Sequence, residues 1–167
     1  FLAFSRPLEL KFEPFEAEPF LKRIIDRWQP RMARVNVKPV LSVEKDLRKV
    51  IGDPRSLENV FTNLISNALE AMTETGDTLA VKAVMVNEIN GHPAVEISVS
   101  DNGPGIPEDV KERIFEPFIT TRKMGTGLGL AITKQIVNAH KGSLRVDSFP
   151  GGTVFTVQLP AEREESK

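Results

Sequence analysis

The chain has 167 residues, of which 40% are hydrophobic and 27% charged, a composition typical of a globular domain with one core of ordinary size. Its formal net charge is -1, so we expect no nucleic-acid partner. The lack of cysteine excludes disulfides and thiolate chemistry, and with only two histidines any metal should be held by oxygen ligands. No apolar run reaches membrane-spanning length and no signal peptide is present, so we expect a cytoplasmic domain without direct membrane contact. Because the chain starts at Phe1 and not at Met, we expect this domain to be cut from a longer parent protein.

Before residue 53 the sequence predicts one helix and two short strands. Apolar side chains recur at helical spacing over residues 16–33, which is typical of an amphipathic helix. Residues 35–43 and 50–52 have the composition of strands, and Pro39 favours a sheet edge for the first of them. Because Pro7 would end any helix containing residues 1–7, we expect residues 1–12 to be the remnant of an upstream helix and its linker.

A long helix is expected to begin at Asp53 and Pro54, an N-cap acceptor followed by proline at the first helical position. Its apolar stripe consists of Leu57, Val60, Phe61, Leu64, Ile65, Ala68 and Met72. A second, polar stripe consists of Asn59, Asn63, Asn67 and Glu70. Asparagine is a mediocre helix former, so several aligned asparagines indicate oxygen ligands for a hard cation such as Mg²⁺; a solvated polar face would give the same pattern.

A hairpin follows, with a strand over residues 79–86, a turn at Asn90 and Gly91, and a half-buried strand in which Val95, Ile97 and Val99 alternate with polar residues. This second strand ends at Ser100 and delivers Asp101 to a glycine-rich loop. A carboxylate in this place can accept a hydrogen bond from a ligand amine, although Asp-Asn-Gly is also a common turn sequence.

Beyond residue 106 we expect a helix over 108–115, a lid over 118–124, a helix over 128–140 closed by Gly142 in the left-handed conformation, and a hairpin of strands 143–149 and 153–159. Two glycine-dense loops, 101–105 and 125–129, flank this lid region, and such loops turn backbone amides toward an anion. We interpret them as a nucleotide site.

Two other nucleotide-binding motifs do not fit the sequence. No Gly-Lys-Ser/Thr occurs, which excludes a P-loop, and no strand precedes the second loop, which argues against a Rossmann fingerprint. Residues 161–167 are expected to form a frayed tail.

Four separated blocks resemble the catalytic, ATP-binding domain of sensor histidine kinases, in the superfamily that includes DNA gyrase, related chaperones and MutL-type repair ATPases. NLISNALEAM resembles the N box, DNGPGIP the first glycine box, IFEPFITT the F box and GTGLGLAI the second glycine box. The closing block GGTVFTVQLP is also similar to that family, and the short lid resembles the nitrogen-regulator type. The resemblance implies an α/β (α+β) sandwich: a mixed, mostly antiparallel sheet of about five strands with three main helices on one face, over residues 13–160.

The same resemblance implies roles for individual residues. Asn67 would bind Mg²⁺, Asn63 would orient phosphate, and Asp101 would accept from the adenine amino group with help from Thr153. The other implied ATP-binding residues are Glu70, Gly103, Gly105, Ile106, Thr120, Thr121, Lys123, Gly125, Thr126, Gly127, Leu128 and Gly129, with Arg122 as a further lid residue. Phe115 and Phe118 would couple the lid to a neighbouring helical domain; core or hinge packing is the alternative.

The resemblance also implies a reaction and partners. The domain would transfer the γ-phosphoryl group of ATP, with Mg²⁺, to a histidine of an upstream dimerisation domain, for relay to a response-regulator aspartate. The parent would be a homodimer and this domain a monomer. His92, by a turn, and His140, at a helix end where it would complement the helix dipole, do not fit the acceptor role. A serine kinase of anti-sigma type and a non-enzymatic ATP-gated interaction module are the two alternatives.

Overall fold

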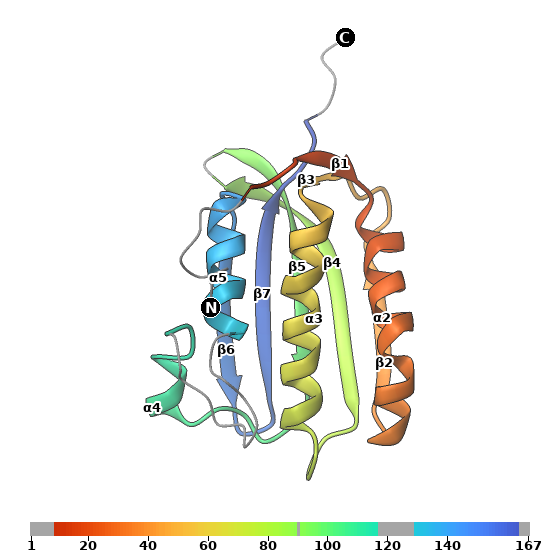
Figure 1. The fold of residues 1–167 in the computed structure, drawn as a ribbon, viewed down its shortest axis with the longest axis vertical. Coiled ribbons are helices and arrows are strands. Elements are labelled where there is room, and N and C mark those ends of the chain that lie inside the picture. Colours follow the sequence, from red (N-terminus) through yellow and green to blue (C-terminus); the bar gives the residue numbers. More distant parts are fainter. Residues whose placement is uncertain (1–8, 90, 117–128, 164–167) are drawn as a thin grey trace.

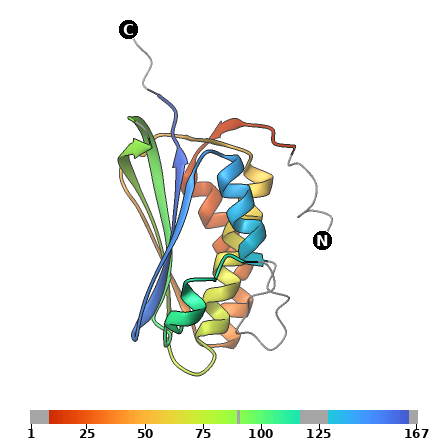
Figure 2. The same cartoon turned by 90° about the vertical axis from the view of Figure 1, so that its left-hand side faces the viewer.

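The computed structural model describes residues 9–89, 91–116 and 129–163, and within them a five-stranded sheet covered on one face by three helices (Figures 1 and 2). The strand order is β2-β4-β5-β7-β6, with bounds Lys38–Val43, Thr78–Ile89, His92–Asp101, Gly152–Pro160 and Ser143–Phe149. The β2 and β4 pair is parallel and the other three pairs are antiparallel. The expected mixed, mostly antiparallel sheet is therefore confirmed, as is the edge position of the strand that contains Pro39.

The covering helices are α2 (Ala17–Arg34), α3 (Pro54–Ala71) and α5 (Gly129–Ala139), and α3 lies between the other two in Figure 1. The predicted N-cap is confirmed, because the Asp53 carboxylate accepts a hydrogen bond from the Arg55 N–H at 3.2 Å. Every residue of the predicted apolar stripe on α3 is buried. Burial of that stripe against the sheet fixes which face of α3 is left for the asparagines. Of the helices in the described residues, none is both long and apolar enough to cross a membrane.

A second, two-stranded sheet pairs β1 (Glu13–Phe15) with β3 (Val50–Gly52). Sequence reasoning missed β1, because three residues are too few to show a period. The predicted tail also begins too early. Ala161 is buried and bridges Val50, and the Glu162 N–H donates to the Lys49 carbonyl at 2.7 Å. These contacts tie the end of β7 to β3.

Two helix ends differ from expectation. Helix α4 covers only Glu108–Lys111, because the chain then continues in tight turns that direct Ile114 into the core. At the end of α5 the left-handed residue is Lys141 (φ 59°) and not Gly142. The Gly142 N–H donates to the Val137 carbonyl and the Lys141 N–H to the Asn138 carbonyl, both at 3.0 Å, which is a Schellman cap. Gly142 instead passes so close to the Gln158 carbonyl that a side chain would overlap it.

His140 also differs from expectation. It is 1% exposed, its Nδ1 lies 2.8 Å from the Ile136 carbonyl, and its Nε2 accepts from the Asp53 N–H at 3.0 Å. A ring that accepts at Nε2 and faces a carbonyl at Nδ1 is the neutral tautomer protonated on Nδ1. His140 therefore does not complement the helix dipole as a cation; it joins the end of α5 to the start of α3.

Candidate functional site

The site is built around Asp101, the last residue of the central strand β5. It lies where this strand ends, near the C-terminal end of α3. Asp101 is 9% exposed, and its carboxylate accepts a hydrogen bond from the Gly103 N–H at 2.9 Å. Burial raises the pKa of this carboxyl above its ordinary value, against the opposing effect of the Gly103 and Thr153 N–H groups. A desolvated carboxylate with few protein partners is well suited to accept a hydrogen bond from a ligand.

The loop after Asp101 needs its two glycines for close packing against neighbouring backbone. A Cβ atom at Gly103 would lie 2.8 Å from the Ala71 carbonyl oxygen at the end of α3. Gly105 has φ +88°, and a Cβ there would overlap the Phe149 carbonyl. The loop is therefore clamped between α3 and the β6–β7 hairpin, which places it beside Asp101.

Ser148 on β6 holds the other side of this loop. Its hydroxyl accepts from the Ile106 N–H at 2.7 Å and lies 3.1 Å from the Thr153 hydroxyl. Thr153 is 3% exposed and pairs with Asp101 across β5 and β7, so Asp101, Thr153 and Ser148 form one row across three strands. Sequence reasoning missed Ser148. A signal in the sequence could have found it: the two-residue loop Pro150-Gly151. Such a loop pairs Phe149 with Gly152, and this register places Ser148 opposite Thr153.

Asn102 is a second residue that sequence reasoning missed. Its Oδ1 accepts from the N–H groups of Asp77 at 2.8 Å and Thr78 at 3.0 Å, while its Nδ2 donates to the Asp77 carboxylate at 2.9 Å. Hydrogen bonds from Asn102 and Thr78 lower the pKa of that exposed carboxyl. Asn102 therefore ties the start of β4 to the loop that follows Asp101.

The residues of the polar stripe on α3 differ in their exposure and in the contacts that they make. Asn59 and Glu70 are exposed. The Asn63 Nδ2 donates to the Gly129 carbonyl at 3.3 Å and to the Thr133 hydroxyl at 3.2 Å, which connects α3 to the first turn of α5. The half-buried Asn67 has no hydrogen-bond partner among the described residues. One face of α3 thus brings Asn63 to Gly129, and its end brings Ala71 to Gly103.

These groups fit ATP and Mg²⁺ in their chemistry. Asp101 supplies a buried acceptor for an amino group, and Asn67 supplies an amide oxygen, without a partner among the described residues, of the kind that Mg²⁺ accepts. Among the described residues, no cluster of three histidine, aspartate or glutamate side chains could hold a metal alone. A cation here would therefore take most of its ligands from phosphate and water.

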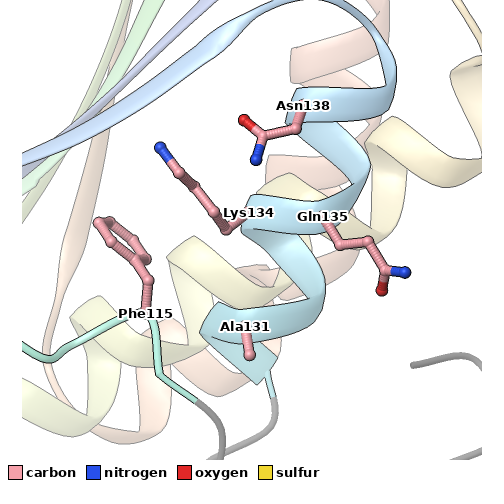
Figure 3. Close-up of a pocket in the computed structure, with 5 residues that line it drawn as sticks. All are labelled: Phe115, Ala131, Lys134, Gln135 and Asn138. Atoms are coloured by element: carbon pink, nitrogen blue, oxygen red, sulfur yellow. The ribbon is translucent and has the colours of Figure 1, made fainter. Parts of the chain in front are cut away.

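The predicted lid lies outside the described residues, and with it Phe118, Thr120, Thr121, Arg122, Lys123, Gly125, Thr126, Gly127 and Leu128. Phe115 is described: it is half-buried and makes an edge contact with Phe155. Figure 3 shows Lys134 and Asn138 extending from α5 on the side where Phe115 lies, and these residues line an open pocket of about 300 Å³ with Ala131 and Gln135. The Lys134 ammonium lies 5.4 Å from the Phe115 ring centre and donates to the Leu144 carbonyl at 3.1 Å. None of the residues that line this pocket belongs to the row that contains Asp101.

Residues 52–163 match the family described as histidine kinase-, DNA gyrase B-, and HSP90-like ATPases. The match covers more than half of the chain, and the protein belongs to this family. Within it, the relatives are sensor histidine kinases. Sporulation kinase A of Bacillus subtilis (strain 168) is 43% identical over 120 residues, which are 71% of this chain and 19% of that protein. Sensory histidine kinase/phosphatase NtrB of Klebsiella oxytoca is 35% identical over 133 residues, 77% of this chain and 38% of that protein. The chain spans well under half the length of both.

Solved structures lead to the same group. The catalytic domain of histidine kinase ThkA has a TM-score of 0.79 at 29% identity, covering 90% of this chain and 96% of that one. Full-length ShkA in complex with AMPPNP has a TM-score of 0.84 at 29% identity, covering 99% of this chain and 35% of that one. The fold is therefore that of a histidine kinase catalytic domain, as the resemblance implied.

Proposed function

We propose that this chain is the ATP-binding catalytic domain of a two-component sensor histidine kinase, which transfers the γ-phosphoryl group of ATP to a histidine of an upstream dimerisation domain. The observation that carries the proposal is the buried Asp101 carboxylate at the end of β5, beside a loop held by Gly103 and Ser148. Asp101 would accept a hydrogen bond from the adenine amino group, and Thr153 would assist in binding the base. Gly105 would leave room for the base and Ile106 would pack near it.

The phosphates would lie between α3 and the start of α5. Asn67 would bind Mg²⁺ and Asn63, already joined to Gly129, would orient phosphate beside it. Glu70 would lie next to this group, and the lid residues from Thr120 to Leu128 would close over it. Bound Mg²⁺ would neutralise charge on the transferring phosphoryl group, so the main task of the protein is to position the reactants.

Transfer to another group is favoured over hydrolysis, because hydrolysis needs a base for water. By the resemblance, the hydrolytic relatives carry a glutamate four residues before the metal asparagine, and this chain has Asn63 there, whose amide cannot take a proton. The two histidines of the chain are unsuited as acceptors. His140 is buried with both ring nitrogens engaged. His92 begins β5 while Asp101 ends it, about 30 Å away at the usual rise per residue. The acceptor would therefore belong to the upstream domain, of which residues 1–12 would be the end.

The onward partner would be the receiver domain of a response regulator. The structure of ThkA in complex with the response regulator TrrA resembles this chain with a TM-score of 0.80 at 27% identity and supports this part of the proposal. The parent would be a homodimer through its dimerisation domain, whereas this domain alone would be a monomer. Since the reaction consumes ATP, the domain would work in the cytoplasm.

The test is to mix the 167-residue chain with γ-labelled ATP, Mg²⁺ and the dimerisation domain of a sporulation kinase or of the parent. We expect an acid-labile, alkali-stable phosphohistidine on the added domain and very little phosphate release without it. ATP binding with no transfer to any histidine domain would favour the non-enzymatic module, and label on a serine protein would favour the serine kinase.

A further inference from the structure

The Ser148 hydroxyl contacts both the loop after Asp101, at the Ile106 N–H, and the side chain of Thr153. It lies opposite Thr153 in the β6–β7 pair, and Thr153 lies opposite Asp101 in the β5–β7 pair. Side chains in register on adjacent strands point to the same face of a sheet. The Ser148 hydroxyl, the Thr153 hydroxyl and the carboxylate proposed to bind the base therefore lie in one row on the same face of the sheet.

The Ser148 hydroxyl has one proton and two lone pairs to distribute among its neighbours. The Ile106 N–H takes one lone pair at 2.7 Å. The proton has two possible acceptors, the Thr153 hydroxyl oxygen at 3.1 Å and the Gly152 carbonyl at 3.4 Å. The contact to Thr153 is the shorter and lies just beyond the usual range of about 2.5–3.0 Å for an O–H···O hydrogen bond, whereas the contact to Gly152 is longer and weaker.

When Ser148 donates to Thr153, the proton of Thr153 is directed away from Ser148 and is available to the site. This matters because purines differ on the edge that Asp101 would face. Adenine presents an amino donor beside an acceptor nitrogen, whereas guanine presents a carbonyl acceptor beside an N–H donor. A carboxylate acceptor beside a hydroxyl donor matches adenine, directly or through one bridging water, and opposes guanine.

We propose that Ser148 is a positioning residue that sets the purine preference of the site, by holding the Thr153 hydroxyl as a hydrogen-bond donor while it anchors the loop through the Ile106 N–H. This inference rests on the proposed ATP-binding function. It assigns specificity to a residue that need not touch the nucleotide.

The test measures the affinities for Mg-ATP and Mg-GTP by titration calorimetry. It compares the unsubstituted 167-residue chain, called the parent in these tests, with the variants Ser148→Ala and Ser148→Thr. We expect the parent to favour ATP, Ser148→Ala to lose about five- to tenfold of that preference, the worth of roughly one hydrogen bond, and Ser148→Thr to restore it. The matched control is Ser143→Ala, on the same strand, whose hydroxyl contacts only the Gln158 side chain among the described residues. It should leave the ratio unchanged.

A loss of affinity that is equal for both nucleotides in Ser148→Ala would show a purely structural role and would overturn the inference, as would an unchanged ratio or a parent without purine preference. Those results leave the proposed function intact. A parent that binds neither nucleotide would overturn both.

Thr153→Val keeps the shape of the side chain and removes its hydroxyl, so it tests the same step without disturbing the Ser148 contact to Ile106. We expect it to lower the preference for ATP as Ser148→Ala does. In the double variant, Ser148→Ala should add no further change to the ratio, because Ser148 acts through Thr153. Additive effects of the two changes on the ratio would overturn the inference.

Discussion

The two ends of the proposed nucleotide site differ in how many of their polar groups already form hydrogen bonds within the protein. At the base end, Asp101, Ser148 and Thr153 are joined to one another or to the adjoining loop by hydrogen bonds. At the phosphate end, Asn67 has no hydrogen-bond partner among the described residues, and Asn63 uses its amide nitrogen to join α3 to α5.

This difference indicates that hydrogen bonds within the protein organise the base end without a ligand, whereas the amide of Asn67 would bind the proposed Mg-ATP. A preorganised acceptor adds selectivity because a mismatched base leaves buried groups unpaired. An uncommitted amide on a well-packed helix suits a cation that brings its own water and phosphate ligands. Substitutions at the two ends should therefore separate effects on stability from effects on binding.

The largest effect is expected for Asn67→Ala. Phosphoryl transfer to the added histidine domain should fall by about 100-fold, because a group that holds charge in place during the reaction is lost. The free energy of unfolding should stay the same or rise slightly, since alanine is the better helix former. Transfer assays with Mg-ATP and urea denaturation measure both. Asn59→Ala, an exposed position on the same helix, is the control, and unchanged transfer in Asn67→Ala would contradict the assignment.

The next effect is expected for Asp101→Asn at the base end. ATP affinity should fall by about 1 to 3 kcal/mol, because the amide places a donor against the amino group of adenine. Titration calorimetry measures this change, and the exposed Asp147→Asn on β6 should bind ATP like the parent. Equal affinity of Asp101→Asn and the parent would place the base elsewhere.

Asn63→Ala should behave in the opposite way to Asn67→Ala in stability. It removes the donor to the Gly129 carbonyl and to the Thr133 hydroxyl, so the free energy of unfolding should fall by about 1 to 2 kcal/mol. Urea denaturation of the two variants side by side measures the contrast. Equal stability of both variants would show that the bonds between α3 and α5 contribute nothing measurable.

The smallest effect concerns pH. Because burial raises the pKa of Asp101 in the folded state, the folded protein holds this proton more tightly than the unfolded chain. The stabilising contribution is fully present below the ordinary aspartate pKa and is lost as pH rises through the raised value. Asp101→Asn should therefore gain stability relative to the parent as pH rises from about 3 to 7. Thermal unfolding of both proteins across this range checks the slope, and parallel curves would contradict it.

Much of the fold could be predicted from local patterns. The stripe on α3 and the alternation in β5 predicted which residues are buried, because burial follows period in a helix or strand. Asp53 and Pro54 predicted the start of α3 for a similarly local reason, the hydrogen bond of an N-cap. Position in the chain was also enough to bring Asp101 to the end of its strand and into the adjoining glycine loop.

Contacts between distant segments could not be predicted in this way. The strand β1, the neutral His140 between two helices, and the row formed by Asp101, Thr153 and Ser148 all depend on which strands are neighbours and in what register. A shift of one residue in a strand turns its side chains to the other face, so no local pattern reveals such a row.

The residues that would contact ATP could thus be identified from sequence motifs, because each motif forms a local feature: a turn, a helix cap or a ligand atom. The residues that hold them in place, Ser148, Asn102 and Thr133, follow only from the folded arrangement. Their partners lie on other strands and helices, and only the packing of α3 and the pairing of β5, β6 and β7 brings those partners within hydrogen-bond distance.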